Sequence, residues 1–441
     1  MKLKSNITAI VLLLLFTTLI SAQTNIEDVK TFTLKNGMKF LVLEDHSIPN
    51  ANMYIFFKVG SRNEYPGITG LSHFFEHMMF NGAKKYGPKM FDRVMEAGGG
   101  ANNAYTSQDV TVYTDFFPAS ATELIFELEA DRIENLALDD KMVESERGVV
   151  LAERITTMEN SNYSLLDEQV VSVSFIAHPY GWSVLGFESD IRNWRKSDLQ
   201  KYFETYYAPN NAVVVMAGDI TLENVKALAA KYFEPIPSRE PPRPVHTKEP
   251  KQLGEKRIYV HKNVTTPNIM IVYHAPDAKS DDYYPVDMLN SILSEGKSSR
   301  LYKSLVDEKQ LAVDIFSNFD ATIDPHLFAI FVICAGNNNE EAVEKAVYEE
   351  IDKIVKEGVT DQELQKVKNG KLMDFYRGME TINRRANTIG SYEVFFGGYE
   401  KLFSAPEDYQ KVTPEDIKRV AAAYLNKSNR TVGILKNIEE K

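Results

Sequence analysis

The sequence contains a single cysteine, Cys334, among 441 residues. An internal disulfide is therefore impossible, and a structural zinc site, which normally uses several cysteines, is disfavoured. Cys334 lies in the apolar stretch AIFVICAG, which predicts a buried free thiol. Histidine is also scarce, with eight residues, so two histidines at a ligand-like spacing are informative.

Long hydrophobic runs are absent apart from one, Ala9 to Ile20. Two lysines precede this run and two small residues close it, so residues 1–22 are predicted to be an export signal that is cleaved before Gln23. A membrane anchor is the alternative, but the run is short for a span. No cysteine directly follows it, which excludes lipid attachment there, and an Arg-rich mitochondrial presequence is absent as well.

The mature chain also lacks a second apolar run and an excess of basic charge. We therefore expect no membrane span in it, and export without disulfides fits a bacterial periplasm better than the eukaryotic secretory route. The net charge is −12, and removal of residues 1–22, with two lysines and no acid, makes it −14. Nucleic acid is not expected as a partner, because phosphate binding needs a basic face. An acidic interior could attract basic peptides, but acidic residues spread over the outside would give the same total.

The stretch GLSHFFEHMMFNG holds His73, Glu76 and His77. The order H-x-x-E-H is that of inverted zinc peptidases, and chance produces it in roughly one chain per hundred of such composition. On a helix the two rings share one face. Neutral imidazoles suit zinc, and Glu76 is placed to take a proton from a water at the metal. A separate apolar stripe remains for burial, formed by Leu71, Phe74, Phe75, Met78 and Met79.

A hydrolytic zinc site needs a third protein ligand and one position left to water. The stretch DKMVESERGVVLAERITTMEN offers Glu146 and Glu153, seven residues apart. Seven residues make nearly two helical turns, so both carboxylates are predicted to lie on one face of a helix. Acidic residues at this spacing usually mark only a solvated face, but the histidine pair makes these two candidate metal-site residues.

These stretches resemble the pitrilysin/insulinase family of metallopeptidases, which includes the mitochondrial processing peptidase. In that family H-x-x-E-H is followed by a stretch like E-R-x-V-x-x-x-E, which residues 146–153 match. The resemblance implies that His73, His77 and Glu153 bind Zn²⁺. It also implies that Glu76 is the general base and that Glu146 supports the ligands from a second layer.

A third matching stretch, EAGGGANNAYTSQDVTVYTDFFP, begins with the turn signal Gly98 to Gly100 and continues with strand-like alternation. An ordinary hairpin is the simpler interpretation. In the family, the corresponding G-G-x-x-N-A-x-T is an edge strand on which the peptide substrate lies. The resemblance implies that role for Asn103, Ala104, Tyr105 and Thr106. Strand addition binds any extended peptide through its backbone, while pockets for alternate side chains supply selectivity.

A proline-rich segment, with six prolines in residues 235–250, divides the chain and predicts an extended linker. We expect a zinc-bearing domain at 23–234 and a further domain at 251–441. The two are predicted to be copies of one unit, because residues 197–220 and 415–438 match in register. Both halves alternate strand-like runs with long helical stretches, which predicts α+β sheet domains with helices on one side.

The resemblance implies an α+β fold in which two homologous sheet-plus-helix domains face each other as a clam shell around a peptide chamber. The C-terminal half has no H-x-x-E-H, so one zinc per chain is expected. The stretches VGSRNE (59–64) and HPYGWSVLG (178–186) also resemble family segments. We expect His178 to anchor a loop and assign it no catalytic role.

The C-terminal half departs from the family pattern at one point. Many active relatives carry an Arg and a Tyr seven residues apart that reach the substrate at the metal, and the matching positions here are Val306 and Val313. Valine cannot donate a hydrogen bond to an oxyanion, and such donors contribute strongly to catalysis. Some two-chain members place zinc on one subunit and the Arg/Tyr pair on the other. We therefore expect the zinc-bearing subunit of a heterodimer, with a homodimer, or substitution by Arg300 or Tyr302, as the alternatives.

The sequence thus predicts a zinc-dependent endopeptidase that cleaves extended peptides or unfolded segments in an enclosed chamber. One other possibility is a catalytically silent family member that acts as a binding or assembly subunit. Such members usually lose ligands, whereas this chain keeps all four site residues. A zinc hydrolase of non-peptide substrates is a further possibility, against which the strand-like segment around Asn103 speaks.

Overall fold

The structure, a computed structural model, describes residues 24–336 and 339–438. The predicted export signal, residues 1–22, lies outside them. The strands of the first half form one sheet in the order β1-β2-β6-β3-β5-β4. They are β1 (Val29–Thr33), β2 (Lys39–Glu44), β3 (Asn50–Phe57), β4 (Ala101–Thr106), β5 (Thr111–Pro118) and β6 (Ala212–Gly218). The helices of this half are α2 (Leu71–Met78), α3 (Met90–Ala97), α4 (Thr122–Asn135), α5 (Asp140–Asn160), α6 (Asn162–Ser174), α7 (Glu188–Asn193), α8 (Lys196–Tyr206) and α9 (Leu222–Tyr232).

The second half builds its sheet in the order β7-β11-β8-β10-β9. These strands are β7 (Lys256–His261), β8 (Asn268–His274), β9 (Ala312–Asn318), β10 (Leu327–Cys334) and β11 (Arg430–Lys436). The helices are α10 (Tyr283–Ser294), α11 (Glu340–Glu357), α12 (Asp361–Gly378), α13 (Ile382–Ser391), α14 (Glu400–Lys411) and α15 (Pro414–Tyr424). Apart from β1, the two sheets share one strand order, and in both the last strand lies between a parallel and an antiparallel neighbour.

The two halves repeat each other down to single hydrogen bonds. In the 3₁₀ turn between α8 and β6, the Nδ2 atom of Asn211 donates to the carbonyl of Tyr206 at 2.8 Å. In the equivalent turn between α15 and β11, the Nδ2 atom of Asn429 donates to the carbonyl of Tyr424, also at 2.8 Å. Each amide thus closes the same turn in its own half. The predicted fold class, two homologous α+β domains, is confirmed.

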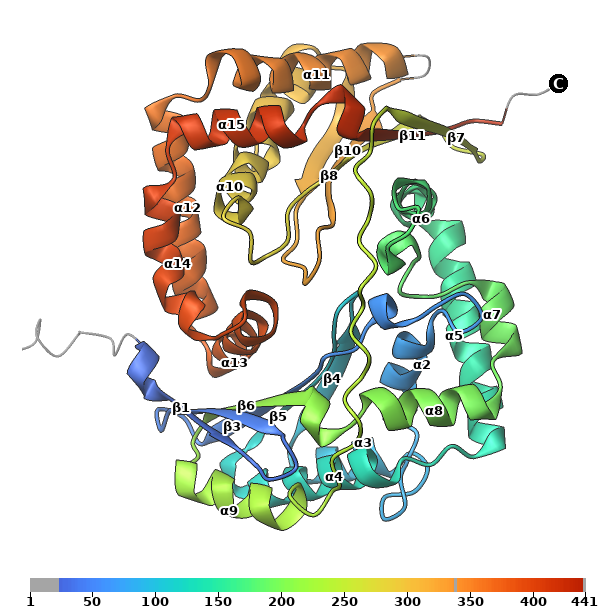
Figure 1. Cartoon of the computed structure of the whole chain (residues 1–441), viewed down its shortest axis with the longest axis vertical. Helices are drawn as coiled ribbons and strands as arrows, with labels where there is room; N and C mark the ends of the chain where they lie inside the picture. The colour runs from blue at the N-terminus through green and yellow to red at the C-terminus, as the bar shows by residue number, and fades with distance from the viewer. Residues whose placement is uncertain (1–23, 337–338, 439–441) are drawn as a thin grey trace, which may run out of the picture.

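The halves are joined because each sheet is covered on one face by a helix from the other half. Apolar side chains of α13 pack on the first sheet against Val213 and Val215 of β6. In return, Leu166 and Val170 of α6 pack on the second sheet against Met270 and Val272 of β8. Figure 1 shows this arrangement, with α13 over the first sheet and α6 beneath the second. The sequence predicts that each sheet carries helices on one side. This holds for the helices of the sheet's own half, whereas a helix from the other half also covers the sheet.

Residues 235–250 contain no helix or strand and run from α9 to β7 beside both halves (Figure 1). The carboxylate of Glu249 accepts hydrogen bonds from the backbone N–H groups of Ile176, Ala177 and His178 at 2.9–3.0 Å. The end of this segment is thereby fixed to the first half. In the part of the chain that the structure describes, no helix combines the length and apolar character needed to cross a membrane.

Candidate metal centre

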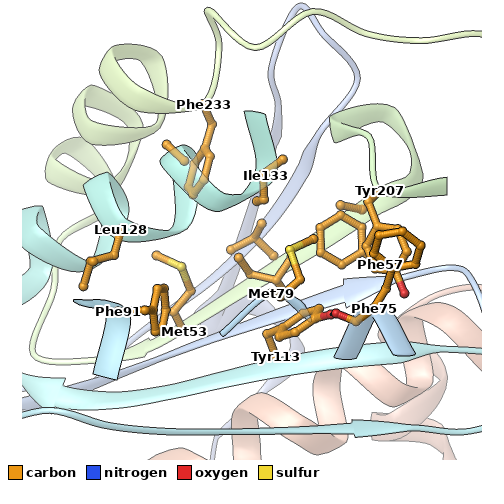
Figure 2. Close-up of a cluster of buried hydrophobic side chains, with 14 of the residues drawn as sticks. Met53, Phe57, Phe75, Met79, Phe91, Tyr113, Leu128, Ile133, Tyr207 and Phe233 are labelled. Atoms are coloured by element: carbon orange, nitrogen blue, oxygen red, sulfur yellow. The ribbon is translucent and has the colours of Figure 1, made fainter. Parts of the chain in front are cut away.

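Helix α2 carries both histidines and is held from two directions. Its apolar side faces the core, where the Phe75 ring lies 5.2 Å from the Tyr207 ring; Figure 2 shows Phe75 and Met79 among the buried side chains there. At its N-terminus, the Glu64 carboxylate accepts hydrogen bonds from the N–H groups of Gly70 and Ser72 at 2.7 and 2.8 Å. The predicted apolar stripe of α2 is buried throughout, which leaves the opposite side free for chemistry.

The side chains of His73, His77 and Glu153 converge on one point. The Nε2 atom of His73 lies 3.6 Å from one oxygen of Glu153, and the Nε2 atom of His77 lies 3.4 Å from the other. All three ligand atoms lie within 4.8 Å of one another, the only such group among the residues that the structure describes. Zinc–ligand bonds of roughly 2.0–2.2 Å in a tetrahedron need ligand separations of this size. The donor set therefore fits zinc.

Glu146 orients one of the histidines from behind. It lies on α5 with Glu153, and one oxygen is 2.8 Å from Nδ1 of His77. The other oxygen accepts a hydrogen bond from Asn81 at 2.7 Å. Burial lowers the pKa of His77, but the nearby carboxylates, Glu146 foremost, outweigh it and raise the pKa. Burial lowers the pKa of His73 to about 4, which keeps this ring in the neutral form that a metal requires.

Glu76, on helix α2, lies beside the ligands and next to the end of strand β4. One of its oxygens accepts a hydrogen bond from the hydroxyl of Thr106 at 2.6 Å. Burial raises the pKa of Glu76, and the Thr106 hydrogen bond offsets part of that rise. Thr106 is predicted from the sequence to bind substrate. Its hydroxyl also binds the candidate general base, a contact that the sequence does not indicate.

Strand β4 is the edge of the first sheet within the described residues, and its side chains alternate in direction. Ala104 and Thr106 face α2, whereas Asn103 and Tyr105 are more exposed on the opposite face. The Tyr105 hydroxyl donates to Asn387 of α13 at 3.0 Å, which ties the strand to the second half. A groove of about 650 Å³ runs beside the strand and the ligands, and its lining includes Glu76, His77, Phe80, Asn103, Ala104 and Glu146.

Among the described residues of the second half, the contacts do not indicate a substitute for the missing Arg/Tyr pair. Val306 is partly buried against the core of that half, whereas Val313 on β9 is 61% exposed. Arg300 pairs with Glu363 at 2.7 Å and also donates to the Gly358 carbonyl, so its guanidinium is engaged. Tyr302 packs against the second core. Both of the expected substitutes are thus bound into their own half.

Sequence reasoning missed Asn81 and Glu64. Asn81 holds the far oxygen of Glu146, and Glu64 caps the helix of the histidines. Glu64 lies in the stretch VGSRNE. This stretch resembles a family segment, but the resemblance does not indicate what Glu64 contacts. The predicted free thiol of Cys334 is confirmed as buried.

Comparisons with known proteins show the family and the fold. The family model Insulinase (Peptidase family M16) matches residues 39–187, and Peptidase M16 inactive domain matches residues 193–371. Zinc protease PqqE of Helicobacter pylori is 33% identical over 433 residues, which cover 94% of each chain. The crystal structure of a protease from the same organism has a TM-score of 0.88 at 31% identity and covers 92% of this chain and 99% of that one. The periplasmic protease PqqL of Escherichia coli shares the fold, with a TM-score of 0.75 and 18% identity, over 95% of this chain but 48% of its own.

Proposed function

The chain belongs to the insulinase (M16) family of peptidases, and from this premise we propose that it is a zinc-dependent endopeptidase that cleaves extended peptides or unfolded segments. The convergence of two imidazole nitrogens and one carboxylate carries the proposal. Glu76 and an edge strand lie directly beside that point. Relatives that carry the name zinc protease support the same reaction class.

His73, His77 and Glu153 are the residues that would hold the ion. Zinc bound there supplies Lewis-acid chemistry, because it polarises a carbonyl and makes a water more acidic. Glu76 takes the proton of the attacking water and passes it to the leaving amine. Burial raises the pKa of Glu76, which suits a group that must accept a proton and then release it.

Peptide substrate is proposed to bind as an added strand along β4. The outer side of the strand has no strand neighbour among the described residues, as strand addition requires. The N–H of Ala104 donates to the Oδ1 atom of Asn103 at 2.9 Å, a contact that a substrate strand would replace. Small Ala104 lets a substrate backbone come close, and the adjacent groove receives substrate side chains. Binding through the backbone of the substrate favours extended or unfolded segments, because a folded segment does not offer a free strand edge.

We also propose that the chain is the zinc-bearing subunit of a two-chain enzyme. Val306 and Val313 occupy the positions of the missing Arg/Tyr pair, and Arg300 is engaged by Glu363. The fold of this chain spans about half of the periplasmic protease PqqL, which supports a partner of similar build. The partner is a homologous subunit that supplies the Arg/Tyr pair in a heterodimer, with a homodimer as the alternative.

Export to the periplasm completes the proposal. Residues 1–22 form the signal that is removed, residues 23–234 the zinc-bearing domain, residues 235–250 the linker and residues 251–441 the second domain. The extended course of the linker supports this division, and PqqL is described as periplasmic.

The proposal is tested on purified mature chain by metal analysis and by cleavage of unstructured peptides and small esters. We expect one zinc per chain, loss of that zinc on substitution His73→Ala, and cleavage of peptides. Zinc without any cleavage, alone or with a homologous partner, would instead identify a silent binding subunit. Cleavage of esters alone would identify a hydrolase of other substrates, and a chain without zinc would remove the peptidase proposal.

Glu146→Gln is expected to weaken zinc binding by about 10- to 100-fold without unfolding the protein, because residues that orient a metal ligand contribute on this scale. The amide would no longer be a charged partner for Nδ1 of His77. Competition with a chromogenic chelator measures the change. Glu144→Gln on the same helix, at a residue 67% exposed in its side chain, is the matched control. Equal affinities in both variants would remove Glu146 from its role.

A further inference from the structure

A loop of the second half, Thr322 to His326 between β9 and β10, contacts the first half through Asp324. One oxygen of Asp324 accepts a hydrogen bond from Nε of Arg62 at 2.6 Å and lies 2.6 Å from the Nη2 atom of the same guanidinium. The same oxygen lies 3.1 Å from Nε2 of His178. The Arg62 side chain is 14% exposed and that of Asp324 30% exposed, so the contact is largely shielded from water. A charge-assisted contact of this kind is stronger than a surface ion pair.

The loop is fixed to its own half and is therefore a firm support. The N–H of Ala275 donates to the carbonyl of His326 at 2.8 Å, and the N–H of Ala278 donates to the carbonyl of Thr322 at 3.0 Å. Within the loop, the Thr322 hydroxyl donates to the carbonyl of Asp324 at 2.8 Å. Movement of the second half would therefore move Asp324 with it.

A further contact of the same loop reaches the turn that follows strand β4. Asp109 in this turn is 3% exposed and accepts a hydrogen bond from the N–H of Ile323 at 3.1 Å. The Tyr180 hydroxyl lies 2.7 and 2.9 Å from the two oxygens of Asp109, to which it donates. These contacts do not involve the Asp324 side chain, so the turn stays anchored if that carboxylate is changed.

Arg62 connects Asp324 to the helix of the histidines. Arg62 lies in the 3₁₀ turn Ser61–Asn63, where its N–H donates to the carbonyl of Gln108 at 2.9 Å. The next residue after this turn is Glu64, whose N–H donates to the carbonyl of Ser61 at 3.1 Å. Glu64 is 4% exposed and caps α2 through two backbone N–H groups. The path from Asp324 to α2 thus consists of direct contacts and one short chain segment.

We propose that Asp324 is a positioning residue for the metal centre: by holding Arg62 it fixes the segment from which Glu64 caps α2. The half without metal ligands thereby sets the placement of His73 and His77. The competing explanation is that Asp324 only joins the two halves. The chain contains a matched pair for that comparison, because Arg385 of α13 also crosses between the halves to Asp45, at 2.6 Å. Asp45 follows β2, and its carboxylate binds Arg385 and the N–H of Ser47, neither of which belongs to α2 or to its cap.

The variants are Asp324→Asn, Arg62→Gln, the double variant, and Asp45→Asn as the control. Hydrogen exchange of residues 71–78 and chelator competition for zinc are measured first, since neither requires turnover. In Asp324→Asn we expect both the exchange rate of α2 and the zinc dissociation constant to rise by about tenfold, the scale of one charge-assisted hydrogen bond. The double variant should be no worse than Arg62→Gln alone, because Asp324 acts only through Arg62. Arg62→Gln itself also removes the ion pair of Arg62 with Asp109 at 3.7 Å. Asp45→Asn should leave both quantities within about twofold.

The kinetic readout rests on the proposed function, whereas exchange and zinc binding do not. With peptide substrate, Asp324→Asn should lower kcat by about tenfold and change KM by less than about twofold, because Asp109 still anchors the turn after β4. An equal rise in the exchange rate of α2 in Asp324→Asn and Asp45→Asn would overturn the inference. So would a double variant in which the effects of the two single substitutions on exchange and zinc binding add. If Asp324→Asn does not fold, Arg62→Lys replaces it. Selective loosening of α2 then supports the inference, and uniform loosening overturns it.

Discussion

Substitution of Glu76 by Gln is expected to lower peptide cleavage by about 10²- to 10⁴-fold, the usual contribution of a positioned general base. The amide keeps the size of the carboxylate and can still accept the hydrogen bond from Thr106, so the local structure should persist. It cannot take a proton from water. The zinc content should stay at one per chain, because His73, His77 and Glu153 are unchanged. Initial rates with a quenched fluorescent peptide, together with metal analysis of the same sample, measure the effect.

The control for this variant is Glu144→Gln, which removes a carboxylate that is 67% exposed and lies outside the groove. Glu144 also lies outside the group of three ligand residues, so its loss should change the rate by less than about threefold through the local field alone. A variant at Glu76 that lost its zinc would show that the carboxylate supports the site rather than the chemistry. Retained cleavage would show that another group acts as the general base. The carboxylate nearest to the ligands with an oxygen that accepts no hydrogen bond would then be substituted next.

The parts of this site that the sequence predicted are those that lie on single helices. His73 and His77 share a face because they are four residues apart, and Glu146 and Glu153 share a face because they are seven apart. The two spacings do not show that the helix with the histidines lies against the helix with the glutamates. That contact was implied by the family resemblance. The structure places all four side chains together, which makes the prediction of the ligand group a sound basis for experiment.

The contacts that the sequence could not predict join segments far apart in the chain. Asp324 and Arg62 are 262 residues apart, and Tyr105 and Asn387 are 282 apart. No periodicity connects such residues, because the two members of each pair lie in different halves of the chain. The exchange of α6 and α13 between the sheets is of the same kind. An amphipathic pattern shows that a helix has a face to bury, but it does not say which sheet the face will meet.

Alone, the chain is expected to cleave unstructured peptides about 10²- to 10³-fold more slowly than when mixed with a homologous chain that carries the Arg/Tyr pair, since one lost oxyanion donor costs about this much. Val306 and Val313 offer no donor, and Arg300 is held by Glu363. Titration of one chain against the other should give a rate that saturates at a fixed ratio. A partner in which the Arg and Tyr are replaced by Val is the control, and it should bind without raising the rate.

The same deficit can be tested within this chain by restoring the missing groups. Val313 is 61% exposed on β9, so Val313→Tyr should be accepted without loss of stability, whereas Val306→Arg introduces a charge at a partly buried position and should cost about 1–3 kcal/mol. If the pair acts within one subunit, the double variant should gain activity without a partner. If it acts only across subunits, the double variant should stay slow at concentrations where it is monomeric and should become active when it dimerises or is mixed with unmodified chain. Full turnover of the unmodified lone chain would refute the two-chain proposal while leaving the zinc site intact, because that site depends on α2 and α5 and not on these valines.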